Sequence, residues 1–263
     1  MNVAGRTVLL TGATGGLGHA IARRLRAAGA ELVLSGRRSE VLEPLAAETG
    51  ARSLAVDLAD PAAVERLADE CAEVDVLVAN AGLPASGHLM SFRLEEIDRA
   101  LAVNLRAPMV LARHLAERMV ARRSGHLVFM SSLSGKVGTA RGSVYSATKF
   151  GLRGFAQSLR EDLRPSGVGV SAVFPGFVRD AGMFYDAGVK VPPWVGTSTS
   201  AAVAEAVLQA IEHDRGEVDV APLGVRAGAK VAGLAPDLAA SVQRKLGGQK
   251  IAEQHVTGQA DKR

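Results

Sequence analysis

A glycine-rich segment near the N-terminus constrains the fold of this chain most strongly. The apolar run at 8–10 predicts a buried strand, and the apolar spacing at 20–28 predicts a helix after it. The four glycines between residues 12 and 18 lie where the strand must turn tightly into the helix. Without Cβ atoms, this backbone can approach a pyrophosphate, which the free N–H groups of the helix N-terminus can bind. We therefore expect a nucleotide-binding strand–turn–helix unit rather than an ordinary glycine-rich turn.

Strands and helices alternate along the rest of the chain. The apolar run 74–79, broken only by Asp75, is typical of a parallel strand buried on both faces. Further strands are expected at 31–35, 53–56, 126–130, 168–174 and 218–221, and helices at 39–48, 61–70, 94–120, 145–163 and 199–213. This order predicts an α/β fold, a Rossmann-type doubly wound parallel sheet of about seven strands with helices on both faces. Ligands of such sheets bind beyond the carboxyl ends of the strands. The candidate residues that follow successive strands are Gly12, Arg37, Asp57, Asn80, Ser132 and Pro175.

A tyrosine and a lysine, Tyr145 and Lys149, stand four residues apart. Ser132 lies thirteen residues before Tyr145. On a helix the spacing of the tyrosine and the lysine rises about 6 Å and keeps both side chains on one face. An ammonium beside a phenol favours the phenolate and lowers the pKa of the phenol, so that it exchanges protons near neutral pH. A serine within reach can hold the oxygen that gains or loses the proton. Unless the pair is merely exposed on a surface helix, it indicates proton and hydride exchange at a carbonyl.

Six motifs together resemble the short-chain dehydrogenase/reductase (SDR) family, in the branch whose chains have about this length. They are Thr11-Gly12-x-x-x-Gly16-x-Gly18, Asn80-Ala81-Gly82, Asn104, Ser132, Tyr145-x-x-x-Lys149 and Pro175-Gly176. The resemblance covers residues 5 to about 221. It implies a single Rossmann domain, a nicotinamide cofactor, and an oxidoreductase that interconverts a carbonyl and a secondary alcohol.

The resemblance also implies roles for the catalytic residues. Tyr145 is expected to be the general acid/base, and Lys149 to lower its pKa and bind the nicotinamide ribose. Ser132 is expected to donate a hydrogen bond to the developing alkoxide, with Ser131 as the adjacent alternative. Asn104 matches the residue that helps hold a water linked to the lysine; without the resemblance, a structural role is equally open.

The end of the second strand indicates which cofactor is preferred. A site for NAD(H) has an acidic residue there, whereas this chain has Gly36 followed by Arg37. Because an arginine offers planar donors for a 2′-phosphate, we expect NADP(H) to be favoured over NAD(H). By resemblance, Asp57 contacts the adenine amino group; it is otherwise a turn former. The positions expected to bind the cofactor are Thr11, Gly12, Thr14, Gly15, Gly16, Leu17, Gly18, Arg37, Asp57, Leu58, Asn80, Ala81, Gly82, Tyr145, Lys149, Pro175, Gly176 and Val178.

The C-terminal third departs from the family pattern. Asp180 stands where the family commonly has a threonine near the cofactor amide, and residues 222–263 form an extension without a recognisable motif. Residues 177–198 are rich in aromatic and apolar side chains, including Phe177, Phe184 and Trp194. We expect a mobile lid there that selects an apolar, bulky substrate, unless these side chains pack on the core or on another subunit.

Composition limits the other classes of function. The 263 residues, 48% of them hydrophobic and 4% aromatic, suit one domain over 1–263 with a core of Ala, Val and Leu. The net charge of +4 arises from interspersed charges, so we expect no nucleic-acid partner. Cys71 is the only cysteine, which excludes an intrachain disulfide and a cysteine-based metal site, and no metal is expected. Without a signal sequence or an apolar run of about 18 residues, no membrane span and a cytoplasmic location are expected.

Two rival functions and a homo-oligomeric state are also considered for this chain. A catalytically silent NADP-binding sensor with a protein partner is one rival; a sugar-nucleotide epimerase or dehydratase is the other. The epimerase class has a larger C-terminal domain than residues 222–263 can form. Family resemblance implies a homodimer or homotetramer with interfaces on the helices at 94–120 and 145–163, where Leu111 and Leu115 could equally face the sheet.

Overall fold

A parallel β-sheet forms the centre of the molecule, which we describe from a computed structural model for residues 1–189, 191–192, 195–237, 240–241 and 248–258. In the described residues the sheet has seven strands in the order β3-β2-β1-β4-β5-β6-β7, and every neighbouring pair is parallel. The strands are β1 (Thr7–Thr11), β2 (Glu31–Gly36), β3 (Arg52–Ala55), β4 (Val76–Ala79), β5 (Gly125–Met130), β6 (Val168–Pro175) and β7 (Glu217–Val220). The predicted doubly wound parallel sheet is therefore confirmed.

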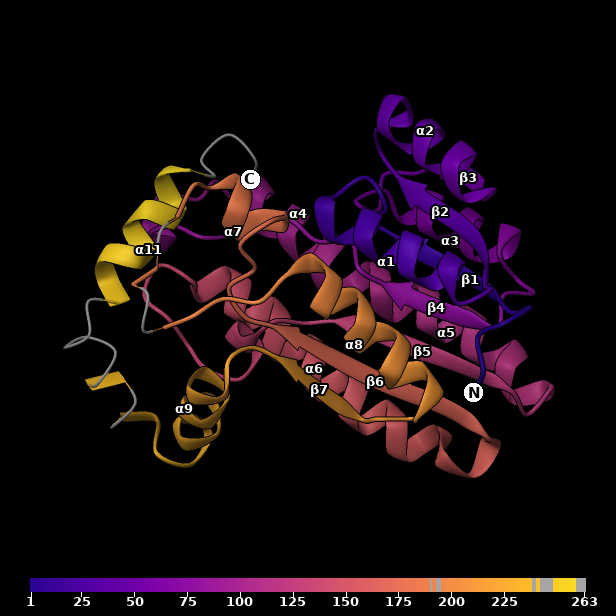
Figure 1. Ribbon diagram of the computed structural model, residues 1–263. Helices are drawn as coiled ribbons and strands as arrows, with labels where there is room; N and C mark the ends of the chain where they lie inside the picture. The colour runs from indigo at the N-terminus through magenta and orange to yellow at the C-terminus, as the bar shows by residue number, and fades with distance from the viewer. Residues whose placement is uncertain (190, 193–194, 238–239, 242–247, 259–263) are drawn as a thin grey trace.

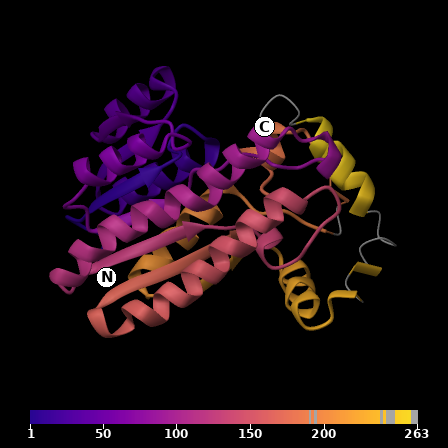
Figure 2. The ribbon, with the colours of Figure 1, turned by 180° about the vertical axis from the view of Figure 1, so that it is seen from behind.

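Helices cover both faces of the sheet (Figures 1 and 2). They are α1 (Gly16–Ala27), α2 (Ser39–Thr49), α3 (Pro61–Glu70), α4 (Leu94–Leu101), α5 (Ala107–Ala121), α6 (Ser143–Leu163), α7 (Gly182–Asp186), α8 (Ser200–Glu212), α9 (Leu223–Leu234) and α11 (Gly248–Thr257). One apolar cluster joins α1, α2 and α8 to the sheet, and a second joins α3, α5 and α6 to its other face. Burial of these two clusters is the main force that stabilises the fold.

The central strands are buried on both faces, as the apolar runs predicted. Val76 to Ala79 are all buried, and β5 is buried over its whole length. The polar residue within the predicted strand, Asp75, precedes β4 and accepts hydrogen bonds from the Thr7 amide (3.0 Å) and from Arg6 (3.2 Å). Asp75 therefore links the start of β4 to the start of β1.

The predicted helix at 94–120 contains a wider turn that the apolar pattern did not show. A π-helical segment, Ala102–Arg106, separates α4 from α5, and the Ala107 amide donates to the Ala102 carbonyl five residues back. Pro108 follows directly and has no N–H to donate to the carbonyl four residues before it, so the regular ladder cannot continue there. The irregular turn and the proline together place Asn104 against the core.

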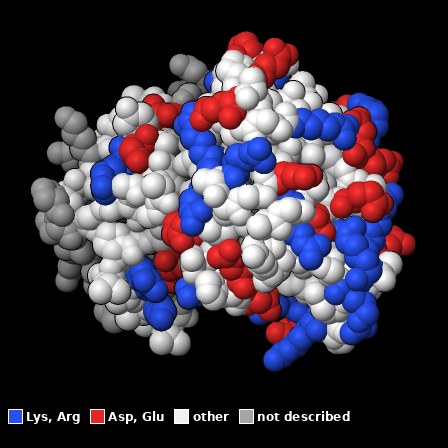
Figure 3. All heavy atoms as spheres, turned by 45° about the vertical axis from the view of Figure 1, so that its right-hand side comes forward, with Lys and Arg blue, Asp and Glu red and all other residues white. Residues whose placement is uncertain are grey.

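Surface and interior side chains follow the expected distribution in most places. Acidic and basic residues are interspersed on the face shown in Figure 3, and several pair, as Arg23 does with Glu48 at 2.6 Å. Cys71 is buried, which raises the pKa of its thiol to about 11. In the described part of the chain, no helix combines the length and apolar character that crossing a membrane requires.

His126, at the start of β5, is a buried titratable group in the sheet. Only 2% of its surface is exposed, and its Nε2 lies 2.8 Å from Ser171 Oγ on β6. Burial lowers the pKa of His126 to about 4; the nearby Arg160 and N-terminal amine act in the same direction, and Asp214 opposes them. The neutral imidazole is thus the form that the folded state holds.

We predict that His126 makes the protein less stable in mild acid. Because the folded-state pKa is near 4 and the unfolded value is about 6.5, the unfolded chain binds the extra proton first as pH falls. The free energy of unfolding should fall by about 1–2 kcal/mol between pH 7 and pH 5, measured by urea titration. His126→Gln should remove this part of the pH dependence, and His213→Gln, at an exposed position, should keep it. Equal pH dependence in the wild type and His126→Gln would contradict the assignment.

Candidate active site

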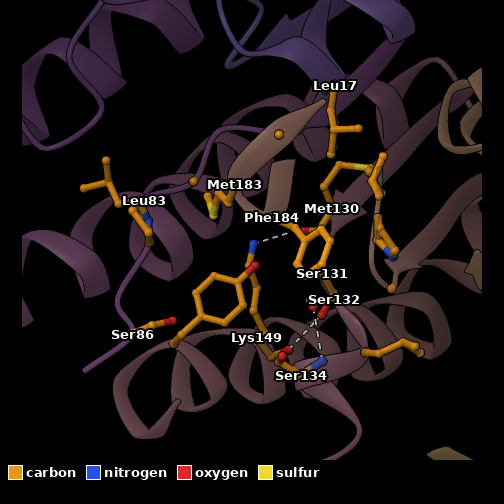
Figure 4. A pocket seen from close by; sticks show the side chains of 18 of the residues that line it. Leu17, Leu83, Ser86, Met130, Ser131, Ser132, Ser134, Lys149, Met183 and Phe184 are labelled. Carbon is orange, nitrogen blue, oxygen red and sulfur yellow. Dashed lines mark hydrogen bonds between the residues drawn. The ribbon is translucent and has the colours of Figure 1, made fainter. Parts of the chain in front are cut away.

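The carboxyl ends of the strands open onto a cavity of about 1670 Å³. Most of the predicted site residues line it, although they come from distant parts of the sequence. Figure 4 shows part of this wall, with the predicted residues Leu17, Ser132 and Lys149 among those labelled. The predicted residues in its wall are Gly12, Thr14, Gly15, Gly16, Leu17, Gly18, Arg37, Asp57, Leu58, Asn80, Ala81, Gly82, Ser132, Tyr145, Lys149, Pro175, Gly176 and Val178. Two predicted residues, Thr11 and Asn104, are almost completely buried and do not line the cavity.

The glycines of the first turn are required by their surroundings. Gly12 has a left-handed backbone (φ 66°), and a Cβ there would lie 2.6 Å from the Ala81 Cα. A Cβ on Gly16 would lie 2.7 Å from the Ala181 Cβ. The turn therefore packs too closely for side chains, and it brings the N-terminus of α1 to the cavity wall. The first N–H groups of a helix have no intrahelical partner, so this end suits an anion.

Thr11 holds this turn from behind. Its Oγ1 accepts a hydrogen bond from the Ala81 amide (3.2 Å), and Asn80 Nδ2 donates to the carbonyls of Thr11 (3.2 Å) and Gly12 (3.1 Å). The two polar side chains thus connect the ends of β1 and β4. Thr11 thus supports the turn, and its expected contact with the cofactor stays a prediction.

The end of β2 forms a second polar part of the cavity wall. Arg37 is exposed and lines the cavity, while Arg38 also lines it and donates to the Thr14 carbonyl (2.6 Å). A Cβ on Gly36 would lie 2.6 Å from Thr14 Cγ2, so the absence of an acidic side chain there has a steric basis. Ser35, also in the wall, is 1% exposed, and its Oγ has no hydrogen-bond partner among the described residues.

Asp57 follows β3 and carries a negative charge toward the same region. Partial burial acts to raise its pKa, but hydrogen bonds from the Ala59 amide (3.0 Å) and Arg99 (2.9 Å) outweigh it, so the pKa is lowered. Arg99 belongs to α4 and also lines the cavity. No motif identified Arg99, because its position opposite Asp57 depends on the packing of α4.

Ser132, Tyr145 and Lys149 come together at the end of β5. Helix α6 carries Tyr145 and Lys149 one turn apart, and the Ser132 side chain lies close enough to the Tyr145 hydroxyl to act on its pKa. Ser132 Oγ also accepts from the Ser134 amide (3.1 Å) at the start of a short 3₁₀ turn. Ser131 instead donates to the Lys149 carbonyl (3.0 Å) and is buried. Of the two serines, Ser132 is therefore the one beside the phenol.

Burial governs the acid–base properties of this group. It lowers the pKa of Lys149 to about 8, and the Lys149 ammonium donates to the Met130 carbonyl at 2.8 Å. Burial also raises the pKa of Tyr145 to about 12, and the hydrogen bond with Ser132 offsets only part of that rise. The expected depressed pKa of Tyr145 is wrong for this structure, because burial removes the hydration that stabilises the phenolate. The Lys149 ammonium lies 5.6 Å from the ring centre.

Asn104 lies behind Gly82, in the π-helical turn. Its Oδ1 accepts from the Leu83 amide (2.6 Å), and its Nδ2 donates to the Leu83 carbonyl (3.0 Å) and to Thr148 Oγ1 (3.4 Å). These bonds connect the loop after β4 to α6. Asn104 thus fixes the backbone beside Lys149, and the predicted role in holding a water stays a prediction.

The segment after β6 contributes an apolar wall. Phe177, Met183 and Phe184 line the cavity, and the two phenylalanine rings lie 4.9 Å apart. The sequence did not predict α7 within this segment. Asp180 accepts from the Ser200 amide (2.8 Å) and hydroxyl (3.1 Å) at the N-terminus of α8, which explains its acidic character. The predicted lid residue Trp194 lies outside the described residues.

The chain belongs to the short-chain dehydrogenase/reductase family, as its motifs indicated. A family model described as short chain dehydrogenase matches residues 6–190. The ketoacyl reductase HetN of Nostoc sp. is 39% identical over 225 residues, which are 82% of this chain and 78% of that protein. The 3-oxoacyl-(acyl-carrier-protein) reductase FabG of Rickettsia conorii is 32% identical over 181 residues, 68% of this chain and 75% of the relative.

Solved structures agree with this family. A short-chain dehydrogenase from Sphingobium yanoikuyae in complex with NADPH has a TM-score of 0.76 and 29% identity, covering 88% of this chain and 95% of its own. A metagenomic short-chain oxidoreductase in complex with NADP has a TM-score of 0.72 and 36% identity, with 84% and 99% covered. Family members bind a nicotinamide cofactor and are oxidoreductases, so this chain is placed in that class of enzyme.

We predict that the close packing of the glycine turn makes Gly18 far less replaceable than Gly15. A Cβ on Gly18 would lie 2.7 Å from the Ala13 Cα, whereas one on Gly15 meets its nearest atom at 3.6 Å. Gly18→Ala should lower the free energy of unfolding by about 1–3 kcal/mol, because the backbone must move. Gly15→Ala is the matched control and should change it little. Similar urea midpoints for the two variants would show that the turn adapts.

Proposed function

We propose that this protein is an NADP(H)-dependent oxidoreductase that interconverts a carbonyl and a secondary alcohol on an apolar substrate. The observation that carries the proposal is that Ser132, Tyr145 and Lys149, the last two one helical turn apart, lie together in the wall of the cavity that also contains the glycine turn. A proton donor, a group to hold an oxygen and an anion-binding helix end thus face one space. This is the set of groups that carbonyl reduction requires.

The cavity wall fits a dinucleotide phosphate. The glycine turn and the start of α1 would hold the pyrophosphate, and Asp57 would lie on the adenosine side. Arg37 and Arg38 line the cavity where a 2′-phosphate would lie, and the unpartnered Ser35 hydroxyl offers a further donor among the described residues. Relatives whose structures contain NADPH or NADP support the same preference.

When bound, the nicotinamide supplies the hydride for reduction or accepts it in oxidation. Tyr145, with a pKa near 12, is protonated at neutral pH and donates its proton to the carbonyl oxygen. Lys149, with a pKa near 8, stays mostly protonated at pH 7, and its charge stabilises the phenolate that forms. Ser132 donates a hydrogen bond to the same oxygen as charge develops on it.

We also propose a domain organisation, a lid and an oligomeric state for this protein. We treat residues 1–263 as one domain whose lid, about residues 177–198, covers an apolar substrate. The aromatic pair Phe177 and Phe184 supports an apolar preference. A homo-oligomer is proposed from family membership and from two apolar side chains at the surface. Leu101 on α4 is 38% exposed and Phe150 on α6 is 43% exposed. Leu111 and Leu115 are instead buried in the protomer. A solution mass of 27.3 kDa would contradict the homo-oligomer.

Tyr145→Phe is predicted to abolish most turnover while the protein still folds and binds NADPH. The substitution removes only the transferable proton, which typically contributes about 10²- to 10⁴-fold to the rate. The assay follows the nicotinamide absorbance during reduction of aliphatic ketones. Tyr185→Phe, which removes the hydroxyl of the chain's other tyrosine at a position 57% exposed, is the matched control and should stay active. Equal rates in the two variants would refute the assigned role, and a wild type that binds NADPH without turning over any carbonyl would favour the silent sensor.

NADPH is predicted to bind more tightly than NADH, and Arg37→Ala should remove most of the difference. A charge-assisted hydrogen bond to the 2′-phosphate is worth about 1.5–3 kcal/mol, so the preference should fall roughly ten- to hundredfold. Fluorescence titration of both cofactors measures it. The affinity for NADH, which lacks the phosphate, serves as the internal control and should not change. Equal affinities in the wild type would overturn the cofactor preference.

A further inference from the structure

Helix α9 presents apolar residues on two opposite sides. Val225, Ala229 and Ala232 recur at helical spacing on one side and line the cavity, and Ala229 and Ala232 are only 7% and 6% exposed. Leu223 and Leu234 lie on the other side and are 79% and 89% exposed. Figure 1 shows α9 beyond the end of β7, across the molecule from α1 and the glycine turn. The cavity therefore reaches from the cofactor end to a helix of the C-terminal extension.

The residues of α9 that line the cavity have small side chains, and there is open space next to the glycines of this helix. Gly224 and Gly228 also line the cavity, and a Cβ built on either would meet no atom within 4 Å. The stretch from Val225 to Ala232 runs roughly 10 Å along the helix axis. No charged side chain belongs to this stretch of the wall among the described lining residues. The result is a long apolar surface made of small side chains.

Other apolar residues line the cavity as well. Phe177, Phe184, Val195 and Ala140 line it from the segment after β6 and from the loop before α6. Arg141, which also lines the cavity, is paired with Glu253 of α11 at 3.2 Å. The volume of about 1670 Å³ exceeds the roughly 1000 Å³ at the upper end of pockets for single small ligands. The cavity is thus larger than one small ligand requires.

We infer that this arm of the cavity, walled by Val225, Ala229 and Ala232 of α9, binds the unbranched hydrocarbon chain of an elongated ketone or alcohol. The inference rests on the proposed function, since it places the reacting carbon beside Tyr145 and the chain along α9. An extended apolar wall with small side chains removes methylene groups from water without offering partners to polar ones. Ala229 and Ala232 then set how long a chain the arm accepts.

The test compares two substitutions of the same kind on opposite sides of α9. The substrates are 2-butanone and 2-decanone with NADPH, and the readout is the ratio of kcat/KM for the long ketone to that for the short one. In the wild type the ratio should exceed one by at least tenfold. Ala229→Leu, which fills the arm, should lower the ratio tenfold or more. Ala227→Leu, on the exposed side and outside the cavity wall, should leave the ratio as in the wild type.

Further measurements separate the possible failures. Ala232→Leu fills the same arm from a second position and should also lower the ratio; NADPH titration shows whether each variant is folded. A wild-type ratio near one, or no difference between Ala229→Leu and Ala227→Leu, would overturn the inference. If NADPH binds but neither ketone is reduced, the proposed function fails, and calorimetry with 2-decanone and the NADP⁺ complex tests the arm itself. If 2-decanone binds, and Ala229→Leu weakens this binding while Ala227→Leu does not, the result would support the inference about the arm. If 2-decanone does not bind, the inference would be overturned.

Discussion

The close approach of the Gly12 turn to the end of β4 is the constraint on which the rest of the site depends. Asn80 and Thr11 hold the two segments together through hydrogen bonds to backbone groups of the facing segment. This contact sets where α1 begins and which side of the sheet edge its N-terminus faces. A side chain at position 12 would force the ends of β1 and β4 apart, and the cavity would lose one wall.

Burial in the cavity wall has opposite effects on the two ionisable groups of α6. It disfavours the charged form of each, so Tyr145 holds its proton more strongly and Lys149 holds its proton less strongly. The sheet causes this environment, because β5 ends beneath α6 and its last carbonyl, on Met130, accepts the bond from Lys149. The chemistry proposed for the site thus depends on a strand end as much as on the Tyr–Lys spacing.

The two ends of the cavity are built differently. At the cofactor end, the wall consists of turns that directly follow sheet strands, and hydrogen bonds between neighbouring strands fix their positions. At the other end, the wall includes α9, which lies outside the sheet (Figures 1 and 2). Segments of the second kind can vary without disturbing the core, which is why we assign the proposed substrate selectivity to them.

Local patterns in the sequence determined much of this protein. Apolar periodicity predicted the strands of the sheet and the helices packed on it to within a few residues, but not α7, α9 or α11. The glycines marked the first turn, and the spacing of Tyr145 and Lys149 placed both on one helix face. These features are legible because each depends on backbone geometry over a few consecutive residues. The tertiary structure decided the rest. Asn104 binds Leu83, 21 positions away, and Arg99 meets Asp57, 42 positions away. The direction of the Tyr145 pKa shift and the wall that α9 adds to the cavity likewise arise only from burial and from contacts between distant segments, which no local pattern encodes.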